Sequence, residues 1–287
     1  MPGAMPPASA WRPLVERALA EDLGSGDLTS ALVISESALG VARIEARESL
    51  TVCGMDVVLE VFRQVDPSLE CQVLCGDSRV AHADERLLQV GGSLRSILAA
   101  ERSALNFLAR LCGIATQAAR YVAAVAGTRA TIVDTRKTLP GWRVLDKYAV
   151  ATGGAHNHRS GLFDGILIKD NHIAAGGGIE AAVKNARVDA PAGIRVQVEV
   201  QSQAEALTAI AAGADFLLLD NCSPDEVARI VDRVGEQALL EASGGIDLSN
   251  VRSYAETGVQ RISCGALTHS VVGSDVALEI DAGAEPQ

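Results

Sequence analysis

The sequence is poor in aromatic residues and in positive charge. Phe, Trp and Tyr make up 3% of the 287 residues, too few for the stacking platforms that hold single-stranded nucleic acid. The formal net charge of −11 at pH 7 also repels nucleic acid and anionic membranes. Both shortages argue against a nucleic-acid or membrane partner.

Long apolar runs and targeting signals are absent as well. No run reaches the ~18 residues that a membrane-spanning helix needs. The opening MPGAMPPASA lacks a basic region followed by an apolar one, so residues 1–10 are expected to be a flexible tail and not a signal peptide.

The six cysteines include no C-x-x-C pair. In a chain of this length without a secretion signal they indicate reduced thiols in a cytoplasmic protein. Cys71 and Cys75, with His82 nearby, leave zinc binding open as an alternative, although burial as small apolar side chains suits them better.

Several catalytic motifs are missing too. There is no P-loop and no G-x-G-x-x-G, which argues against a nucleoside triphosphate or a dinucleotide as ligand. G-x-S-x-G, H-E-x-x-H and the Ser-His-Asp ordering are also absent.

The first part of the chain mixes helical and strand patterns, which indicates a compact α+β unit. Residues 11–24 and 55–66 have helical spacing, the first closing on a glycine, and 41–54 alternates like a pair of strands. Two further strands are expected within 69–76 and 86–92. A long helix should follow from Ser93 to Ala126, broken near Gly113.

After Gly127 the pattern becomes regular. Six short apolar runs, rich in Val, Ile and Leu, alternate with amphipathic helical segments, which is typical of buried parallel strands in βαβ units. Right-handed crossovers then produce a barrel or a doubly wound sheet, and six strands are two short of an eightfold barrel. The runs are 130–134, 165–170, 195–200, 215–220, 238–243 and 261–265.

Each of these runs ends in charged, polar or glycine residues. In a parallel α/β barrel the carboxyl ends of the strands share one rim, where active sites lie, so these residues are expected to converge. Early strands bring cations, middle strands the carboxylates Glu199 and Asp220, and late strands the turn Ser243-Gly244-Gly245. Such a turn and a following helix N-terminus can hold phosphate, and the carboxylates suit ribose hydroxyls or Mg²⁺ on a pyrophosphate.

One basic stretch runs against the acidic background: TRKTLPGWRVLDKYAVATGGAHNHRSGLFDGILIKDNHI, from Thr135 to Ile173. It holds six Lys and Arg residues against three Asp, and three of the chain's five histidines. It is either a solvated basic face or a pocket for an anion, and a buried dianion would need such counter-charges.

This stretch closely resembles the core motif of the quinolinate phosphoribosyltransferase family, the carboxylating nicotinate-nucleotide pyrophosphorylases. AERSALNFLARLCGIAT, VQVEV, LLLDN, EASGGI and GALTHS resemble the family's other blocks in the same order, and the likeness covers roughly Trp11 to Ile280. The resemblance implies an N-terminal α/β sandwich domain (11–112) packed on an incomplete TIM-like α/β barrel (113–270). The C-terminal segment (271–287) would pack back on the N-terminal domain.

The resemblance also implies an activity and an assembly. The family joins quinolinate to phosphoribosyl pyrophosphate, giving nicotinate mononucleotide, pyrophosphate and CO₂ in de novo NAD biosynthesis, with Mg²⁺ as cofactor. The implied assembly is a cytoplasmic homodimer, or a higher oligomer, whose subunits complete each other's sites.

The family's motifs, carried onto this sequence, imply roles for individual residues. Arg136, His158, Arg159 and Lys169 would hold the two quinolinate carboxylates, Lys137 would lie between quinolinate and pyrophosphate, and Arg102 would reach into the partner's site. Glu199 and Asp220 would hold the ribose hydroxyls and Mg²⁺, and Ser243, Gly244, Gly245 and Gly265 the 5′-phosphate. Thr135, Ser263, Cys264 and Ala266 complete the substrate-binding set, and the residues expected to be catalytic are Lys137, Lys169, Glu199 and Asp220.

Some positions depart from the family, which favours apolar or small residues there: Trp142, Asp146, His156 and Cys264. Arg143 and Lys147 lie one helical turn apart and are expected on a solvated face, and His172 is expected to be a core histidine. Without the resemblance, Arg102 would be a helix-surface arginine paired with an acid one turn away.

Three other functions stay open. One is that of a related enzyme of the same fold associated with molybdenum uptake. The second is a Schiff-base aldolase using Lys169, and the third is a non-catalytic sensor of pyridine nucleotides.

Overall fold

The computed structural model describes residues 3–281, which divide between two compact units. Of the described residues, the first unit contains 3–119, 138–154 and 270–281, and the second contains 120–137 and 155–269. Residues 138–154, expected in the barrel domain, thus group with the first unit. Of the expected tail, Met1 and Pro2 lie outside the described residues, as do 282–287, and Ala8–Ala10 form a short 3₁₀ helix.

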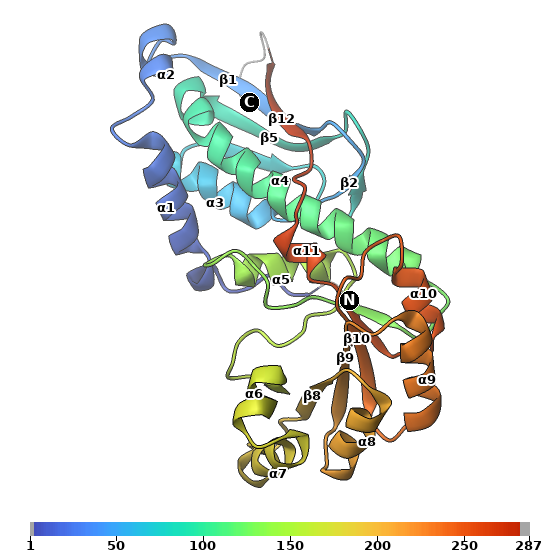
Figure 1. Ribbon diagram of the computed structural model, residues 1–287. Coiled ribbons are helices and arrows are strands. Elements are labelled where there is room, and N and C mark those ends of the chain that lie inside the picture. The colour runs from blue at the N-terminus through green and yellow to red at the C-terminus, as the bar shows by residue number, and fades with distance from the viewer. Residues whose placement is uncertain (1–2, 282–287) are drawn as a thin grey trace. The chain divides into compact units, whose positions relative to one another are not determined.

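The first unit is built on an antiparallel sheet in the order β12-β1-β5-β3 (Figure 1). Residues 41–54 were expected to form two strands paired with each other, and that pairing is wrong. The two strands, β1 and β2, do not pair with each other because β12 and β5 occupy the two edges of β1, while β2 pairs with β4. The strands are β1 (Leu39–Ala46), β2 (Leu50–Thr51), β3 (Glu70–Val73), β4 (Val80–Ala81), β5 (Arg86–Ser93) and β12 (Val276–Asp281).

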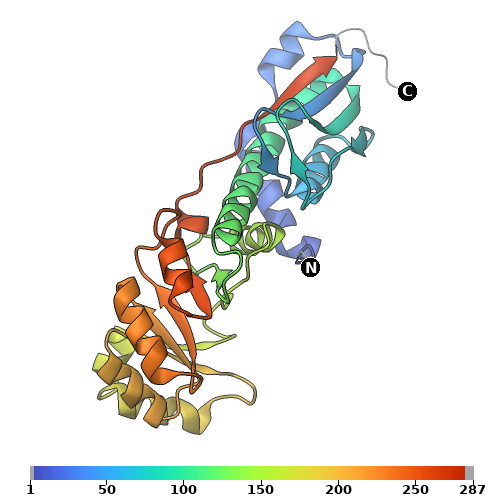
Figure 2. The same cartoon turned by 90° about the vertical axis from the view of Figure 1, so that its right-hand side faces the viewer.

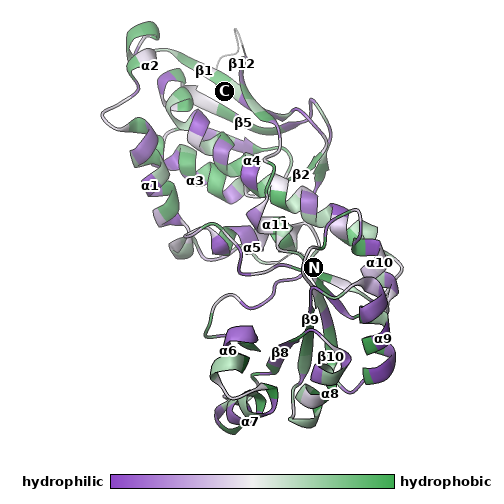
Figure 3. Cartoon of the chain, in the orientation of Figure 1, coloured by the Kyte–Doolittle hydropathy of each residue, from purple (hydrophilic) through white to green (hydrophobic). Residues whose placement is uncertain are grey.

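The helices of this unit follow the sequence pattern except for α2, which the pattern did not predict. They are α1 (Arg12–Leu23), α2 (Leu28–Val33), α3 (Met55–Val65), α4 (Leu94–Ala124) and α5 (Arg143–Thr152), of which α4 continues into the second unit. α1 ends at Gly24, whose φ of 50° suits glycine at a helix end. Hydrophobic and hydrophilic residues alternate around α4 (Figure 3), and Figure 2 shows its length from a second side.

The expected break in α4 at Gly113 is wrong, since the helix runs unbroken for 31 residues. Gly113 is buried, and a Cβ added there would overlap the backbone carbonyl oxygen of Val272 and crowd the Cα of Gly273. The glycine therefore permits close approach of two backbone segments and does not end the helix.

Two of the atypical residues lie at α5, Trp142 as its N-cap and Asp146 in its first turn, and both contact Arg110. Both Asp146 oxygens accept from Arg110, at 3.0 and 2.8 Å, and Asp146 is fully buried. The Trp142 ring stacks on Phe107 with centroids 4.8 Å apart, and Arg110 lies over it. The expectation that Lys147 is solvated is wrong, because this residue is only 5% exposed.

The second unit is a six-stranded parallel sheet in the order β6-β11-β10-β9-β8-β7. All six expected strands are confirmed. Because β6 and β7 stand at opposite edges, the sheet does not close within residues 3–281, as in an incomplete barrel. The strands are β6 (Thr131–Val133), β7 (Ile166–Ile168), β8 (Val196–Val200), β9 (Phe216–Asp220), β10 (Leu239–Ser243) and β11 (Arg261–Ser263).

Helices separate successive strands from β7 onward. They are α6 (Asp170–Ala175), α7 (Ile179–Asp189), α8 (Gln203–Ala211), α9 (Pro224–Val234) and α10 (Val251–Glu256), with α11 (Ala266–His269) after the last strand. α9 begins in a capping box between Ser223 and Glu226. None of the helices within residues 3–281 is long and apolar enough to cross a membrane.

A buried carboxylate links α1 to α3. Glu60 accepts hydrogen bonds from Arg63, Gln64 and Arg12, at 2.6, 2.8 and 2.7 Å. The hydrogen bond from Arg63, followed by those from Gln64 and Arg12, outweighs burial and lowers the Glu60 pKa from 4.5 to about 2.

Gly113→Ala should lower the free energy of unfolding by about 2 kcal/mol or more, because the overlap exceeds the ~1 kcal/mol gained in helix propensity. Urea denaturation measures the difference. Gly76→Ala is the control, since a Cβ there meets nothing within 4 Å. Equal stability of the two variants would contradict the close approach.

Glu60→Gln should destabilise the protein at pH 7 by on the order of 1–3 kcal/mol. The Glu60 carboxyl protonates near pH 4.5 when unfolded and near 2 when folded, so its contribution is complete above pH 4.5 and disappears as the pH falls toward 2. Denaturation curves at pH 7, 4.5 and 3 test whether the gap between wild type and variant narrows. The exposed Glu16→Gln should show no such convergence.

Candidate active site

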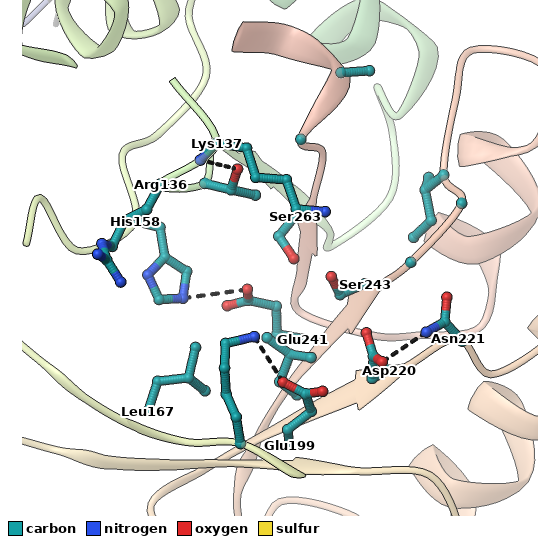
Figure 4. A pocket seen from close by; sticks show the side chains of 18 of the residues that line it. Arg136, Lys137, His158, Leu167, Glu199, Asp220, Asn221, Glu241, Ser243 and Ser263 are labelled. Carbon is teal, nitrogen blue, oxygen red and sulfur yellow. Dashed lines mark hydrogen bonds and ion pairs between the residues drawn. The ribbon is translucent and has the colours of Figure 1, made fainter. Parts of the chain in front are cut away.

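A cavity of about 790 Å³ lies at the carboxyl ends of the parallel strands, and all of its lining residues belong to the second unit (Figure 4). A volume of this size suits small-molecule substrates. The cavity is therefore the candidate active site that strand-end polarity predicts.

Strand register aligns the polar side chains on one face. Asp220, Ser243 and Ser263 end neighbouring strands and are direct partners in the parallel ladder. Residues two positions earlier face the same side, which brings Glu199 and Glu241 into the cavity wall. The alternate positions face the other way and form a dry core: Val196, Val198, Val200, Leu217, Leu219, Leu240, Ala242 and Ile262.

One wall of the cavity is cationic. Arg136 and Arg159 both line this wall. Burial, and after it the charge of Arg136, lowers the pKa of Arg159. The Arg159 guanidinium donates to the carbonyl oxygen of Gly165 at 3.0 Å. Thr268 donates to the backbone carbonyl of Lys137 at 2.9 Å and so ties the loop after β6 to α11. Two guanidiniums held near each other despite their repulsion are the signature of an anion site.

The carboxylates face this wall. Lys169 Nζ contacts Glu199 Oε2 at 2.8 Å, and Asn221 donates to Asp220 Oδ2 at 2.7 Å. Both acids come from neighbouring strands, β8 and β9.

The glycine turn after β10 forms a third part of the lining. Gly244 has a φ of 97°, and a Cβ there would overlap the side-chain amide of Asn221, so only glycine fits. The expected helix N-terminus beside these glycines is wrong, because α10 begins only at Val251. The turn itself lines the cavity, so its backbone is the part expected to bind phosphate.

A buried network lies beneath the cationic wall. Glu241 is 0% exposed and contacts His158 Nε2, Gln197 Nε2 and Arg261 Nε at 3.4, 3.2 and 3.3 Å. Burial alone would raise the Glu241 pKa, but its interaction with His158 and the charge of Arg261 outweigh burial, so the pKa lies below its ordinary value.

Fourteen of the sixteen residues predicted to bind substrate line this cavity: Thr135, Arg136, Lys137, His158, Arg159, Lys169, Glu199, Asp220, Ser243, Gly244, Gly245, Ser263, Gly265 and Ala266. Cys264 does not line it. This side chain is buried on the opposite face of the ladder from Ser263, and its backbone N–H donates to Val133. Arg102 is exposed on α4 in the first unit and is not a lining residue either.

Seven lining residues were not expected from the sequence: Leu167, Leu218, Asn221, Glu241, Ile246, Asp247 and His269. The period of two along a strand could have found Glu241 and Leu218, which precede Ser243 and Asp220 by two positions. The expectation that His172 is a core histidine is also wrong. His172 is exposed, and its Nδ1 accepts from the backbone N–H of Lys169 at 3.0 Å.

The donor set fits Mg²⁺ that arrives with a phosphorylated substrate. No group of three or more His, Cys, Asp or Glu residues within 3–281 forms a cluster able to hold a metal on its own. Mg²⁺ is commonly held by one or two carboxylates together with substrate phosphates, and Glu199 and Asp220 supply two on adjacent strands of the cavity.

Family models match both parts of the chain. The model of the quinolinate phosphoribosyl transferase N-terminal domain matches residues 27–112, and that of the C-terminal domain matches 114–279. The chain is also 40% identical over 260 residues to a probable nicotinate-nucleotide pyrophosphorylase [carboxylating] of Bacillus subtilis, covering 91% of this chain and 90% of that protein. It is 40% identical over 277 residues to the Mycobacterium leprae nicotinate-nucleotide pyrophosphorylase [carboxylating], covering 94% and 97%.

Solved structures agree. The nicotinate-nucleotide pyrophosphorylase from Francisella tularensis superposes with a TM-score of 0.90 at 39% identity, over 96% of this chain and 98% of that one. NadC from Streptococcus pyogenes gives a TM-score of 0.92 at 34% identity, over 97% and 100%. With both domain models matched and relatives similar over nearly their full length, the chain belongs to the quinolinate phosphoribosyltransferase family.

Proposed function

We propose that this protein is a decarboxylating pentosyltransferase that joins quinolinate to phosphoribosyl pyrophosphate in de novo NAD biosynthesis. The products are nicotinate mononucleotide, pyrophosphate and CO₂. The observation that carries this proposal is the convergence of Arg136 and Arg159 on one wall of a cavity whose other walls hold carboxylates and a glycine turn. The family to which the chain belongs supplies the reaction.

The cationic wall is the quinolinate subsite. Arg136, Arg159 and Lys169 neutralise the two carboxylates, and His158 belongs to the same subsite. Removing a dianion from water is costly unless each charge is paired, which accounts for so many cations in an acidic protein.

The opposite wall takes phosphoribosyl pyrophosphate. Glu199 and Asp220 accept from ribose hydroxyls and would hold Mg²⁺, while the turn at Gly244 and Gly245, with Ser243 and Gly265, receives the 5′-phosphate. Lys137 also lines the cavity, and we assign it to the boundary between the two subsites. When bound, Mg²⁺ would neutralise the departing pyrophosphate.

The chemistry follows from this division. The lone pair of the quinolinate ring nitrogen forms a bond to the anomeric carbon as the carbon–oxygen bond to pyrophosphate breaks with its electrons. The positive charge that develops on the ribose lies beside Glu199 and Asp220. The ring nitrogen, now a pyridinium, withdraws the electron pair of the adjacent carboxylate bond, CO₂ leaves, and the ring carbon takes a proton.

Lys169 also bears on the aldolase alternative. Its Nζ donates to Glu199 Oε2 at 2.8 Å, so this nitrogen is engaged with a carboxylate of the cavity. Borohydride trapping in the presence of substrate would mark Lys169 if it formed a Schiff base. The sensor alternative predicts binding without turnover, which the assay below separates.

We also propose a cytoplasmic homodimer with shared sites. All six cysteines are free, as in a reducing compartment. Arg102 is an exposed charged residue on α4 that no described ion pair engages, which suits a role toward a second copy. Neither nucleic acid nor membrane is an expected partner.

Nicotinate, which lacks one carboxylate, should be a far poorer substrate than quinolinate, by on the order of a thousandfold or more in kcat/KM. Its binding would leave part of the cationic wall unpaired. Pyrophosphate release measured with each substrate, with CO₂ collected in equal amounts from quinolinate, tests both the reaction and its selectivity. Equal kcat/KM values would refute the assignment of the cationic wall.

Arg102→Ala should lower activity on the order of a hundredfold or more, the effect of losing a charge-assisted contact to a buried carboxylate, while the fold stays intact. Arg120→Ala, at another exposed arginine of α4, is the control and should stay active. Mixing Arg102→Ala with Lys169→Ala under subunit exchange should restore activity, because a mixed dimer has one site with neither defect. If activity does not recover although subunits are shown to exchange, Arg102 has no role in a partner's site.

A further inference from the structure

We propose that Glu241 is a positioning residue that sets the direction of Arg159 through the imidazole of His158. The inference rests on the proposed function, since Arg159 is placed in the quinolinate subsite. It also assigns a role to a carboxylate that the reaction above does not use.

Glu241 is held rigidly at the centre of the sheet. It lies in the middle of β10, directly opposite Leu218 on one side and Arg261 on the other, and it is 0% exposed. Its Oε2 accepts from Gln197 and faces Arg261, while its Oε1 points toward His158 (Figure 4). Oε1 is buried and has no hydrogen-bond partner among the described residues, so it meets His158 Nε2 as an ion-pair contact at 3.4 Å.

The hydrogen bonds define the tautomer of His158. The backbone N–H of Arg159 donates to Nδ1 at 2.7 Å, so Nδ1 carries a lone pair and no proton. The proton therefore lies on Nε2, which hydrogen-bonds to Gln197 Oε1 at 3.1 Å and has the negative Glu241 Oε1 3.4 Å away. Because Gln197 donates its NH₂ to Glu241, the same carboxylate also turns the amide oxygen of Gln197 toward the ring.

With both ring nitrogens engaged inside the protein, His158 acts on substrate through its neighbour. Its Nδ1 holds the Arg159 backbone, and the Gly165 carbonyl holds the Arg159 guanidinium at 3.0 Å. Arg159 thus stays beside Arg136 against their mutual repulsion. These contacts, from Glu241 through His158 to Arg159, orient the Arg159 guanidinium in the quinolinate subsite before substrate binds.

The rival role for Glu241 is electrostatic. A buried negative charge in the cavity wall could stabilise the positive charge that develops on the ribose. The two roles separate in the kinetics, because a positioning defect in the quinolinate subsite raises KM for quinolinate, whereas loss of transition-state stabilisation lowers kcat.

Glu241→Gln is the sharpest variant because it changes one atom and keeps the shape. An amide has only one oxygen that can accept. Gln197 and Arg261 both face the Oε2 position, whereas only His158 faces the Oε1 position. The amide oxygen should face Gln197 and Arg261, so that its NH₂ meets His158 Nε2. That NH₂ opposes the Nε2 proton, which Gln197 Oε1 alone then accepts, and so favours transfer of the proton to Nδ1, where it opposes the N–H of Arg159.

The first measurement is ¹⁵N NMR of histidine-labelled protein, with the His158 signals assigned from a His158→Asn sample. Wild type should show a protonated Nε2 and an unprotonated Nδ1, and Glu241→Gln should reverse them. KM for quinolinate should rise about tenfold or more while KM for phosphoribosyl pyrophosphate stays within about twofold. Glu256→Gln, at an exposed carboxylate of α10, should change neither.

The exchanged pair, Gln197→Glu with Glu241→Gln, supplies the rescue. A carboxylate at position 197 restores a negative charge beside His158 Nε2, so the double variant should recover the wild-type tautomer and most of the quinolinate affinity. A merely structural role for Glu241 predicts no such recovery.

Three outcomes would overturn the proposal: a protonated Nδ1 in the wild type, a fall in kcat at unchanged KM in Glu241→Gln, or no rescue by the exchanged pair. The NMR arm needs no turnover and is read on the wild type, so it holds if a variant misfolds. Absence of turnover with quinolinate in the wild type would instead count against the proposed function alone.

Discussion

Parallel pairing of β9, β10 and β11 is the constraint on which the candidate active site depends. Because the three strands end level, Asp220, Ser243 and Ser263 stand in one row, and the period of two places Glu241 in a second row beneath them. The opposite face of the same strands is apolar and buried, which fixes the register, since a slip of one residue would exchange the two faces. Folding the sheet and assembling the site are therefore one event.

The site concentrates charges that would repel or cost free energy if they stood alone. Arg136 and Arg159 crowd each other, and Glu241 is removed from water. Opposite charge and hydrogen bonds balance each of them: His158, Gln197 and Arg261 for the buried acid, and the Gly165 carbonyl for Arg159. We place the remaining counter-charge on the substrate itself, which makes the cavity selective for an anion.

Local pattern predicted the elements well. The six parallel strands and the long helix appear where hydrophobic periodicity placed them, and glycine ended α1 as expected. Local pattern failed where tertiary contacts decide whether a residue is buried or what it packs against. Gly113 was expected to break the helix but instead permits the close approach of Val272. Lys147 was expected to be exposed and is buried, whereas His172 was expected to be buried and is exposed. A helical position gives no sign of which backbone or side chain will pack against it.

The sequence by itself determined the strand order along the chain, the ring of polar strand ends, and the motifs that assign the family. Those features depend on residue type and spacing alone, and fourteen of the predicted binding residues do line the cavity. Tertiary structure alone decided that Glu241 and Gln197 face His158, and that Cys264 turns away from the cavity. The physical reason is that such contacts join strands distant in sequence, and their partners are set by the register and twist of the sheet.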